Sequence, residues 1–193
     1  MKVDFKYSPV HVDSDKPEDP NHGHLILDVA HLGNIEVSTG QDDSTLRYVA
    51  REVHFNGPSE HKLDGARHDM EMQIIHELCG ATDQKAHEHT AIVSVLFKRA
   101  EEGHHLIDTL IHSGGTVDFQ QELFDKLHGF YYYRGTHTAP PSVDFVNWFV
   151  LSKVLPVTAK QMAFIQDHWH ESHGFTNYRI TQPLYGRKVS KNF

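Results

Sequence analysis

The sequence predicts a mainly β domain of the α+β class, in which strands dominate and helices are few and short. Apolar runs of strand length recur along the chain, Gly, Pro and Asn turn signals separate them, and only two segments carry helix start signals. The 193 residues suit a single domain with a sizeable core. The chain shows no internal repeat, low-complexity tract or linker, so we expect residues 1–193 to form one domain.

The first predicted strands lie in the N-terminal third of the chain. Residues 1–24 are polar and contain three prolines, so we expect residues 1–20 to be a polar N-terminal extension. Residues 25–29 are apolar and read as a strand. A turn at Gly33-Asn34 then leads into a short strand over residues 35–37.

Four longer strands follow. Residues 47–55 form a strand candidate that ends at Gly57-Pro58, because proline cannot continue a central ladder. Residues 70–77 alternate as a strand does, while residues 91–98 form a nearly continuous apolar run, which is typical of a central buried strand. Residues 144–151 form a similar apolar run. We therefore expect both segments to be buried strands of the sheet.

Both predicted helices begin with the pattern of a capping box, in which a side chain at the cap and a Gln three positions later bond to each other's backbone. Asp118 precedes Gln121 in this way, and Thr158 precedes Gln161. Apolar residues follow at helical spacing, and we expect them to be core contacts. They are Phe119, Leu123 and Leu127 in the first helix and Met162, Ile165 and Trp169 in the second.

The charge balance argues against some partners. Lys and Arg number 18 against 26 Asp and Glu, which gives a formal net charge of −8. A nucleic-acid or anionic membrane surface needs a basic patch that neutralises phosphates, so we expect neither kind of partner. No apolar run approaches the ~20 residues of a membrane helix, so no membrane span is predicted.

Cysteine and histidine usage bear on compartment and metals. Cys79 is the sole cysteine, so no intrachain disulfide can form, and the N-terminus shows no apolar signal region. We therefore expect an intracellular protein, cytoplasmic or organellar, with mitochondria among the candidate organelles. The 18 histidines suggest metal sites, but their pairs lack a nearby third and fourth ligand, so we interpret them as surface and loop residues.

Two neighbouring segments carry the most specific pattern. Residues 54–61 read His-Phe-Asn-Gly-Pro-Ser-Glu-His, and residues 70–76 read Met-Glu-Met-Gln-Ile-Ile-His. Residues two apart on a strand share a face. His54 and Asn56 therefore point the same way, and so do Glu71 and Gln73.

These segments resemble the zinc-binding core of the α-class carbonic anhydrases, which read His-Phe-His-x-Pro-Ser-Glu-His and Met-Glu-x-His-x-x-His. The resemblance implies that family's fold, a large central twisted sheet, mostly antiparallel, with a few short peripheral helices. It also places His54, Asn56 and Gln73 at the three zinc-ligand positions. Three imidazoles and a water hold zinc in that family, whereas the amide oxygens of Asn56 and Gln73 bind zinc poorly. We therefore expect no metal and no other cofactor.

Further motifs extend the resemblance over residues 21–193. Residues 21–24 resemble Asn-Asn-Gly-His and place His24 at the position of the proton-shuttle histidine. Residues 133–141 resemble Tyr-x-Gly-Ser-Leu-Thr-Thr-Pro-Pro, so Thr138 stands where the family orients the zinc-bound hydroxide, with Glu60 as its carboxylate partner. His137 replaces a Leu that walls the substrate pocket. The segments around residues 147–148 and 178–187 resemble the family's closing C-terminal motifs.

The resemblance thus implies a degenerate, catalytically inactive member that serves as a structural or interaction subunit in a larger assembly. Two alternatives remain open. The first is an active zinc carbonate dehydratase with an unusual metal site that recruits another side chain, although the family uses the nearby acids and histidines as supports for its ligands. The second is small-molecule binding in a vacant pocket lined by His54, Asn56, Gln73 and His137.

Relatives of this family also carry a segment before the part seen here, with Trp-Tyr-Gly and Gln-Ser-Pro-Ile-Asn-Ile stretches. The resemblance implies that its loss uncovers part of the core and sheet. Uncovered apolar surface and strand edges favour association. We therefore expect a protein partner to cover this surface.

Overall fold

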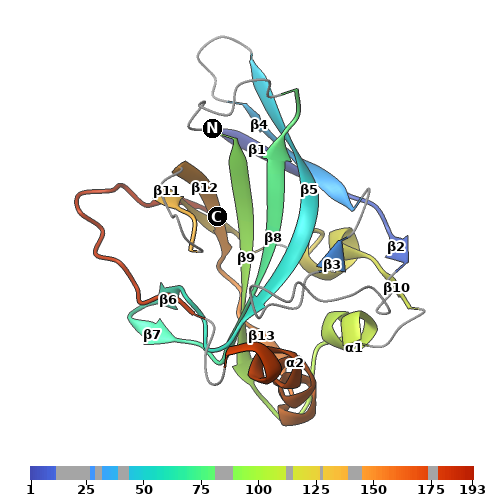
Figure 1. The fold of residues 1–193 in the computed structure, drawn as a ribbon. Helices are drawn as coiled ribbons and strands as arrows, with labels where there is room; N and C mark the ends of the chain where they lie inside the picture. Colours follow the sequence, from blue (N-terminus) through green and yellow to red (C-terminus); the bar gives the residue numbers. More distant parts are fainter. Residues whose placement is uncertain are drawn as a thin grey trace.

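The computed structural model describes residues 1–11, 27–28, 32–38, 44–80, 89–111, 115–126, 128–138, 145–173 and 178–193. Within these residues a curved sheet of ten strands dominates the molecule, with short helices at its lower end in Figure 1. Its main path, in spatial order, runs through β1 (Lys2–Tyr7), β4 (Gly33–Ser38), β5 (Thr45–Asn56), β8 (Met70–Leu78), β9 (Thr90–Arg99), β12 (Phe145–Leu151), β11 (Phe130–Thr136) and β14 (Ser190–Asn192).

The sheet is mostly antiparallel. Among the described strands, the only parallel pairs are β9 with β12 and β9 with β13 (Leu155–Val157), while β3 (Leu27–Asp28) joins β5 antiparallel. Two small ribbons pair β2 (Val10–His11) with β10 (Thr116–Val117) and β6 (Lys62–Leu63) with β7 (Ala66–Arg67). The helices are α1 (His105–Ile111), the π-helix η1 (Gln120–Phe124) and α2 (Ala159–His173). This architecture confirms the predicted fold class.

The two faces of the sheet differ in chemistry because successive side chains on a strand alternate. On one face Phe55, Met72 and Ile74 are fully buried in the main apolar core, together with residues of β9, β12 and the helices. On the opposite face the same strands present His54, Asn56 and Gln73, and the apolar cluster there is small. The candidate site therefore lies on the polar face.

Four predicted strands, over residues 47–55, 70–77, 91–98 and 144–151, are confirmed as β5, β8, β9 and β12. The predicted turn at Gly33-Asn34 is wrong, because both residues lie within β4. Gly33 pairs with Tyr7, and a Cβ on Gly33 would lie 2.5 Å from the Lys6 carbonyl oxygen. Close strand approach therefore explains this glycine. The predicted strand over residues 25–29 is described only at its β3 residues.

Strand β1 lies where the sequence analysis places a polar extension. It forms the sheet edge beside β4, and its inward side chains are Val3, Phe5 and Tyr7. The Phe5 ring stacks on Phe124 at 4.6 Å between centroids, so η1 covers this edge. Charged residues alternate with these apolar ones and lower the mean hydropathy, which hides a strand of period two. Strand β11 and helix α1 were also not predicted.

The capping box predicted at Thr158 is confirmed, and of the one predicted at Asp118 one of the two hydrogen bonds is present. The Asp118 carboxylate accepts a hydrogen bond from the Gln121 backbone N–H at 3.0 Å, although the helix that follows is a π-helix. At α2 the box is reciprocal, since the Gln161 amide oxygen accepts from the Thr158 N–H and the Thr158 hydroxyl oxygen accepts from the Gln161 N–H. Leu127 and the Trp169 side chain lie outside the described residues. Among the described helices, none has the length and apolar character needed to cross a membrane.

Candidate functional site

The sheet register brings the three ligand-position residues together. His54 on β5 lies directly opposite Gln73 on β8, and Asn56 lies opposite Glu71. Directly opposed residues of an antiparallel pair have Cβ atoms about 5 Å apart. The strand parity predicted from the sequence is therefore confirmed by the register, and the site forms at the ends of two central strands.

Gln73 is fixed by two carboxylates. Its amide nitrogen donates to Glu60 Oε2 at 2.8 Å and to Glu71 Oε1 at 3.0 Å, and its side chain is almost fully buried. Carboxylate oxygens accept hydrogen bonds, so they orient the amide with its NH₂ group toward them. The third ligand position thus acts as a double hydrogen-bond donor.

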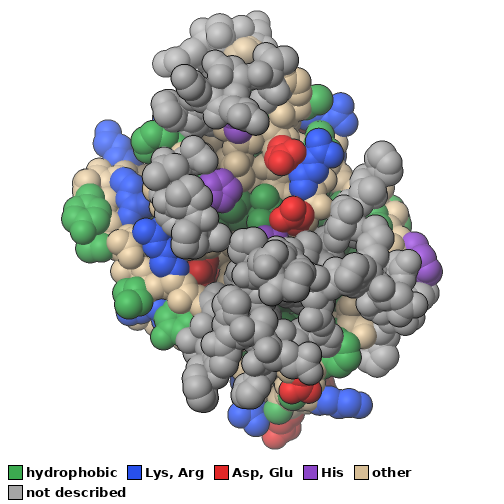
Figure 2. Space-filling model, viewed as in Figure 1, with side chains coloured by type: hydrophobic (Ala, Val, Ile, Leu, Met, Phe, Trp, Pro, Cys, Tyr) green, Lys and Arg blue, Asp and Glu red, His purple; other side chains and the backbone are tan. Residues whose placement is uncertain are grey.

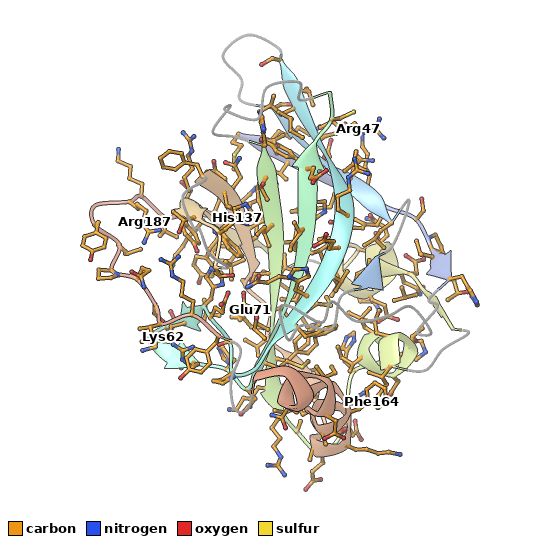
Figure 3. All side chains as sticks on the ribbon, in the orientation of Figure 1. Arg47, Lys62, Glu71, His137, Phe164 and Arg187 are labelled. Atoms are coloured by element: carbon orange, nitrogen blue, oxygen red, sulfur yellow. The ribbon has the colours of Figure 1, made fainter. Side chains whose placement is uncertain are left out.

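Glu71 is the centre of the network and is completely buried (Figure 3). Its carboxylate accepts hydrogen bonds from the backbone N–H groups of Glu60 and His61, from His61 Nδ1, from Ser94 Oγ and from Gln73. Burial alone would raise the pKa of this carboxyl, but the His61 charge and these hydrogen bonds outweigh burial and lower the pKa to about 2. Glu71 is therefore ionised at neutral pH.

His61 pairs with this carboxylate. Burial would lower its pKa, but the charge of Glu71 and the 2.7 Å hydrogen bond to it outweigh burial, and the pKa is raised. The other ring nitrogen, Nε2, lies 2.6 Å from the Tyr133 hydroxyl oxygen, and the Trp148 ring packs edge-on against the imidazole. Burial raises the pKa of the Tyr133 phenol, so Tyr133 stays neutral.

Glu60 completes the network as a second buried acid. Burial and the nearby Glu71 charge raise its pKa, although three hydrogen bonds oppose that rise. They come from Gln73, from the Thr138 hydroxyl and from the Arg179 backbone N–H at 2.8 Å. The predicted pairing of Thr138 with Glu60 is therefore present in the structure.

The remaining predicted residues have different surroundings. His54 Nε2 lies 2.8 Å from Glu52 Oε2 on the same strand face, and the side chain is partly exposed. Asn56 is buried to 2% exposure. His137 Nε2 lies 3.3 Å from the Thr90 hydroxyl, and its carbonyl accepts from Arg179. His24 lies outside the described residues.

This donor set does not fit zinc. Gln73 can offer only its amide oxygen and Asn56 likewise, while Glu52 holds the Nε2 atom of His54. Zinc sites use imidazole, thiolate or carboxylate ligands, with amide oxygens suited to harder cations. Within the described part of the chain, no three His, Cys, Asp or Glu side chains are grouped so that they could hold a metal ion.

The resemblance predicted Glu60, Gln73 and Thr138 at the site. It also implied that nearby acids and histidines, among them Glu71 and His61, support the ligand positions. It left out Tyr133 and Ser94, which contact His61 and Glu71 from other strands. A charged residue inside the otherwise apolar run of β8 was the available signal, because buried acids require several donors. The identity of those donors depends on which strands become neighbours.

A separate cavity of about 480 Å³ opens beside the network. It lies between residues 178–193, which we name the C-terminal arm, and strands β11 and β12. Glu60, His61, Tyr133 and Thr138 form its inner wall. The four residues expected to line a vacant pocket, His54, Asn56, Gln73 and His137, are not among its lining residues.

Comparisons with known proteins agree on the fold. The model of the eukaryotic-type carbonic anhydrase family matches residues 2–193. Dioscorin dioA3 of Dioscorea japonica is 32% identical over 181 residues, which cover 88% of this chain and 62% of that protein. The chain thus spans less than two thirds of that relative's length.

Solved structures give the same result. A halotolerant carbonic anhydrase from Dunaliella salina is similar with a TM-score of 0.76 and 20% identity, over 96% of this chain and 74% of the other. A dioscorin solved in complex with ascorbate has a TM-score of 0.72 and 24% identity, over 99% and 77% of the two chains.

Proposed function

The chain belongs to the eukaryotic-type carbonic anhydrase family, and from this premise we propose that it is a catalytically inactive member that serves as a structural or interaction subunit. The observation that carries the proposal is the double donation from Gln73 to Glu60 and Glu71. A ligand position that donates two hydrogen bonds to buried acids supports the fold and has no nitrogen lone pair for zinc. Hydration of carbon dioxide in this family depends on a zinc-bound water whose pKa falls to about 7.

The network supports this proposal energetically. Glu71 and Glu60 are both buried, and two buried acids this close repel each other when ionised. Gln73 supplies a donor to each of them, so it lowers the cost of keeping both. Removing a partner from such a network costs roughly 3–5 kcal/mol of stability. The substituted residue therefore has a role of its own in this chain.

Zinc content and carbon dioxide hydration test the proposal. Purified protein should hold no stoichiometric zinc by mass spectrometry and should show no hydration above buffer. Stoichiometric zinc with acetazolamide-sensitive hydration would overturn the proposal and favour the alternative of an active dehydratase. That alternative requires a side chain other than Asn56 and Gln73 to enter the site.

A gain-of-binding variant sharpens the test. The double change Asn56→His and Gln73→His should give a protein that retains zinc, because a histidine at position 73 can donate one N–H to a carboxylate and leave the other nitrogen free, as metal-bound histidines do. The matched control is Asn192→His with Gln182→His, which makes the same exchanges at exposed positions. The control should retain no zinc.

Small-molecule binding is a second candidate function. It is supported by the similarity to a dioscorin that was solved in complex with ascorbate. Calorimetric titration with ascorbate tests it directly, and His54→Ala should weaken binding if the pocket around His54, Asn56, Gln73 and His137 is the site. Heat equal to the dilution blank would exclude this candidate for ascorbate.

We also propose that the protein works inside the cell, in the cytoplasm or an organelle. Cys79 is a free and exposed thiol, which is more compatible with a reducing compartment. Fractionation of the native source with an antibody against the chain is the measurement. Recovery in an oxidising, secreted fraction would contradict the proposal.

A further inference from the structure

The arm cavity has a chemistry opposite to that of the whole chain. Four cations line it, Lys62, Arg179, Arg187 and Lys191, against the two acids Glu60 and Asp64. The chain as a whole carries a formal charge of −8. In the part of the chain that the structure describes, none of the four cations forms an ion pair with a carboxylate. A positive cavity in an acidic protein favours an anionic occupant.

Two of these cations, Arg187 and Lys191, lie over aromatic rings. Arg187 lies over the Tyr133 ring at 5.6 Å, and Lys191 lies over the Tyr131 ring at 5.3 Å. Arg187 also donates to the carbonyl oxygens of Leu184 and Pro183. These contacts hold the charged groups in place without neutralising them, because rings and carbonyls carry no net charge. The cavity therefore combines apolar surface with fixed positive charge.

The arm is fastened to the body at both ends. At its start, Arg179 Nη1 donates to Thr136 Oγ1 and to the His137 carbonyl, and Arg67 donates to Thr181. At its end, β14 pairs with the first three residues of β11. Between these anchors the arm bows away from the sheet, as the red trace at the left of Figure 1 shows. The cavity is the space beneath this bow.

The C-terminal arm exposes several large apolar side chains. Large side chains along it are strongly exposed, namely Ile180 at 76%, Leu184 at 55%, Tyr185 at 83%, Val189 at 42% and Phe193 at 69%. Figure 2 shows hydrophobic and basic side chains gathered together on this side of the molecule. Exposed apolar side chains that lie near one another mark interaction sites. The five are spread along the arm from residue 180 to residue 193.

We propose that the arm cavity is a docking groove for an extended segment of a partner polypeptide that alternates apolar and acidic residues. This inference rests on the proposed function as an interaction subunit and names the chemistry of its partner. Apolar side chains of the segment would enter against Tyr133, Trp148 and Val150, and its carboxylates would pair with Arg187 and Lys191. The cavity volume lies within the range of sites that bury a ligand well, about 300–1,000 Å³.

Synthetic peptides test the groove. Three fluorescein-labelled peptides as long as the arm share the same Leu and Phe positions and carry Glu, Gln or Lys between them. Fluorescence anisotropy should show the Glu peptide binding at least about tenfold tighter than the Lys peptide, with weaker binding as ionic strength rises. Equal binding of all three peptides would overturn the proposal, and so would the absence of binding by all three.

Variants locate the binding. Leu184→Glu and the pair Arg187→Ala with Lys191→Ala should each weaken the Glu peptide about tenfold or more. The control pair Lys98→Ala with Arg99→Ala removes the same charges from an exposed strand end outside the cavity and should change binding less than about twofold. Thermal melts of all variants establish that they are folded. Binding that survives both groove variants would place it elsewhere.

The same samples separate this inference from the proposed function. Protein that is free of zinc, inactive and unable to bind the Glu peptide would overturn the groove alone. Protein that hydrates carbon dioxide with zinc yet binds the Glu peptide through Leu184 would overturn the proposed function and leave the groove. Binding of benzoate without binding of any peptide would overturn the proposal and indicate a small anion as the occupant. A dimer that Leu184→Glu dissociates would also overturn it and indicate a second copy of the chain.

Discussion

Two histidines on opposite faces of one strand pair show how hydrogen-bond partners decide the pKa of an imidazole. His76, on the apolar face, is fully buried and donates from Nδ1 to the Ala91 carbonyl, while its Nε2 accepts from the Tyr7 hydroxyl at 2.5 Å. Burial lowers its pKa to about 4. His61, on the polar face, pairs with Glu71, and its pKa is raised. Burial favours a neutral imidazole, and only a carboxylate partner reverses that preference.

An ion pair therefore stabilises the polar face of the sheet, whereas packing stabilises the apolar face. Glu71 has five donors and is ionised, so removing any one partner leaves charge buried. On the apolar face, Tyr7 and His76 satisfy each other as neutral groups amid stacked rings such as Phe124. The polar face thus holds a buried, hydrogen-bonded network around Glu71.

The largest expected effect is the loss of the Glu71 carboxylate. Glu71→Ala should lower the free energy of unfolding by about 3–5 kcal/mol, because it leaves His61 without its charge partner and several buried donors without their acceptor. Urea denaturation measures the change. The control is Glu77→Ala on the same strand, an exposed partner of Arg51, which should cost less than about 1 kcal/mol. If both variants lowered the free energy of unfolding equally, an ion pair would not stabilise the polar face.

The next effect concerns acid. The folded-state pKa of His76 lies below its unfolded value, so its contribution to stability is present above pH ~6.5 and is lost as pH falls toward 4. Between pH 7 and pH 5 the loss should be about 2 kcal/mol. His61 has the opposite sign, because its raised pKa gives stability below the unfolded pKa that is lost as pH rises through the folded one.

Denaturation at several pH values measures this difference. His76→Gln keeps hydrogen-bonding groups but does not titrate, so its stability should fall less between pH 7 and pH 5 than that of the unchanged protein. Nitrogen chemical shifts of the two rings provide a direct check at neutral pH. A protonated His76 at neutral pH would contradict the assignment. Glu71 adds a further acid loss only as pH falls from about 4.5 toward 2.

The smallest effect compares two matched phenol deletions. Tyr133→Phe removes the partner of a charged imidazole, whereas Tyr7→Phe removes the partner of a neutral one. Hydrogen bonds to charged groups contribute about 1.5–3 kcal/mol and neutral ones about 0.5–1.5 kcal/mol. Tyr133→Phe should therefore be the more destabilising by about 1 kcal/mol. Equal unfolding free energies for the two variants would contradict this order.

Local patterns predicted much of the fold. The apolar runs predicted four central strands, and the capping box at Thr158 predicted the start of α2, because each depends on neighbours along the chain. Strand β1 and the Gly33 position could not be predicted in the same way. Gly33 has to be small because Tyr7 and Lys6 approach it across the sheet, and no residue next to it in sequence reveals that contact. The first strand was hidden by its alternating charges.

The candidate site, like the fold, could be predicted only in part from the sequence. Parity on β5 and β8 correctly gave the shared face of His54, Asn56 and Gln73, and the Thr138–Glu60 hydrogen bond was expected from the resemblance. The sequence did not indicate that Gln73 donates to two acids. Glu60 lies 13 residues away and belongs to the loop after β5, so only the folded chain brings it within 2.8 Å.

The sequence alone determined which residues share a strand and a face, since alternation and turn chemistry are local properties of the backbone. It also shows Asn56 and Gln73 at the two positions that the resemblance assigns to zinc ligands. Only the tertiary structure decided the charge of each buried group. A pKa depends on burial and on charges within a few ångströms, and the partners of His61, His76 and Glu71 come from strands far apart in sequence.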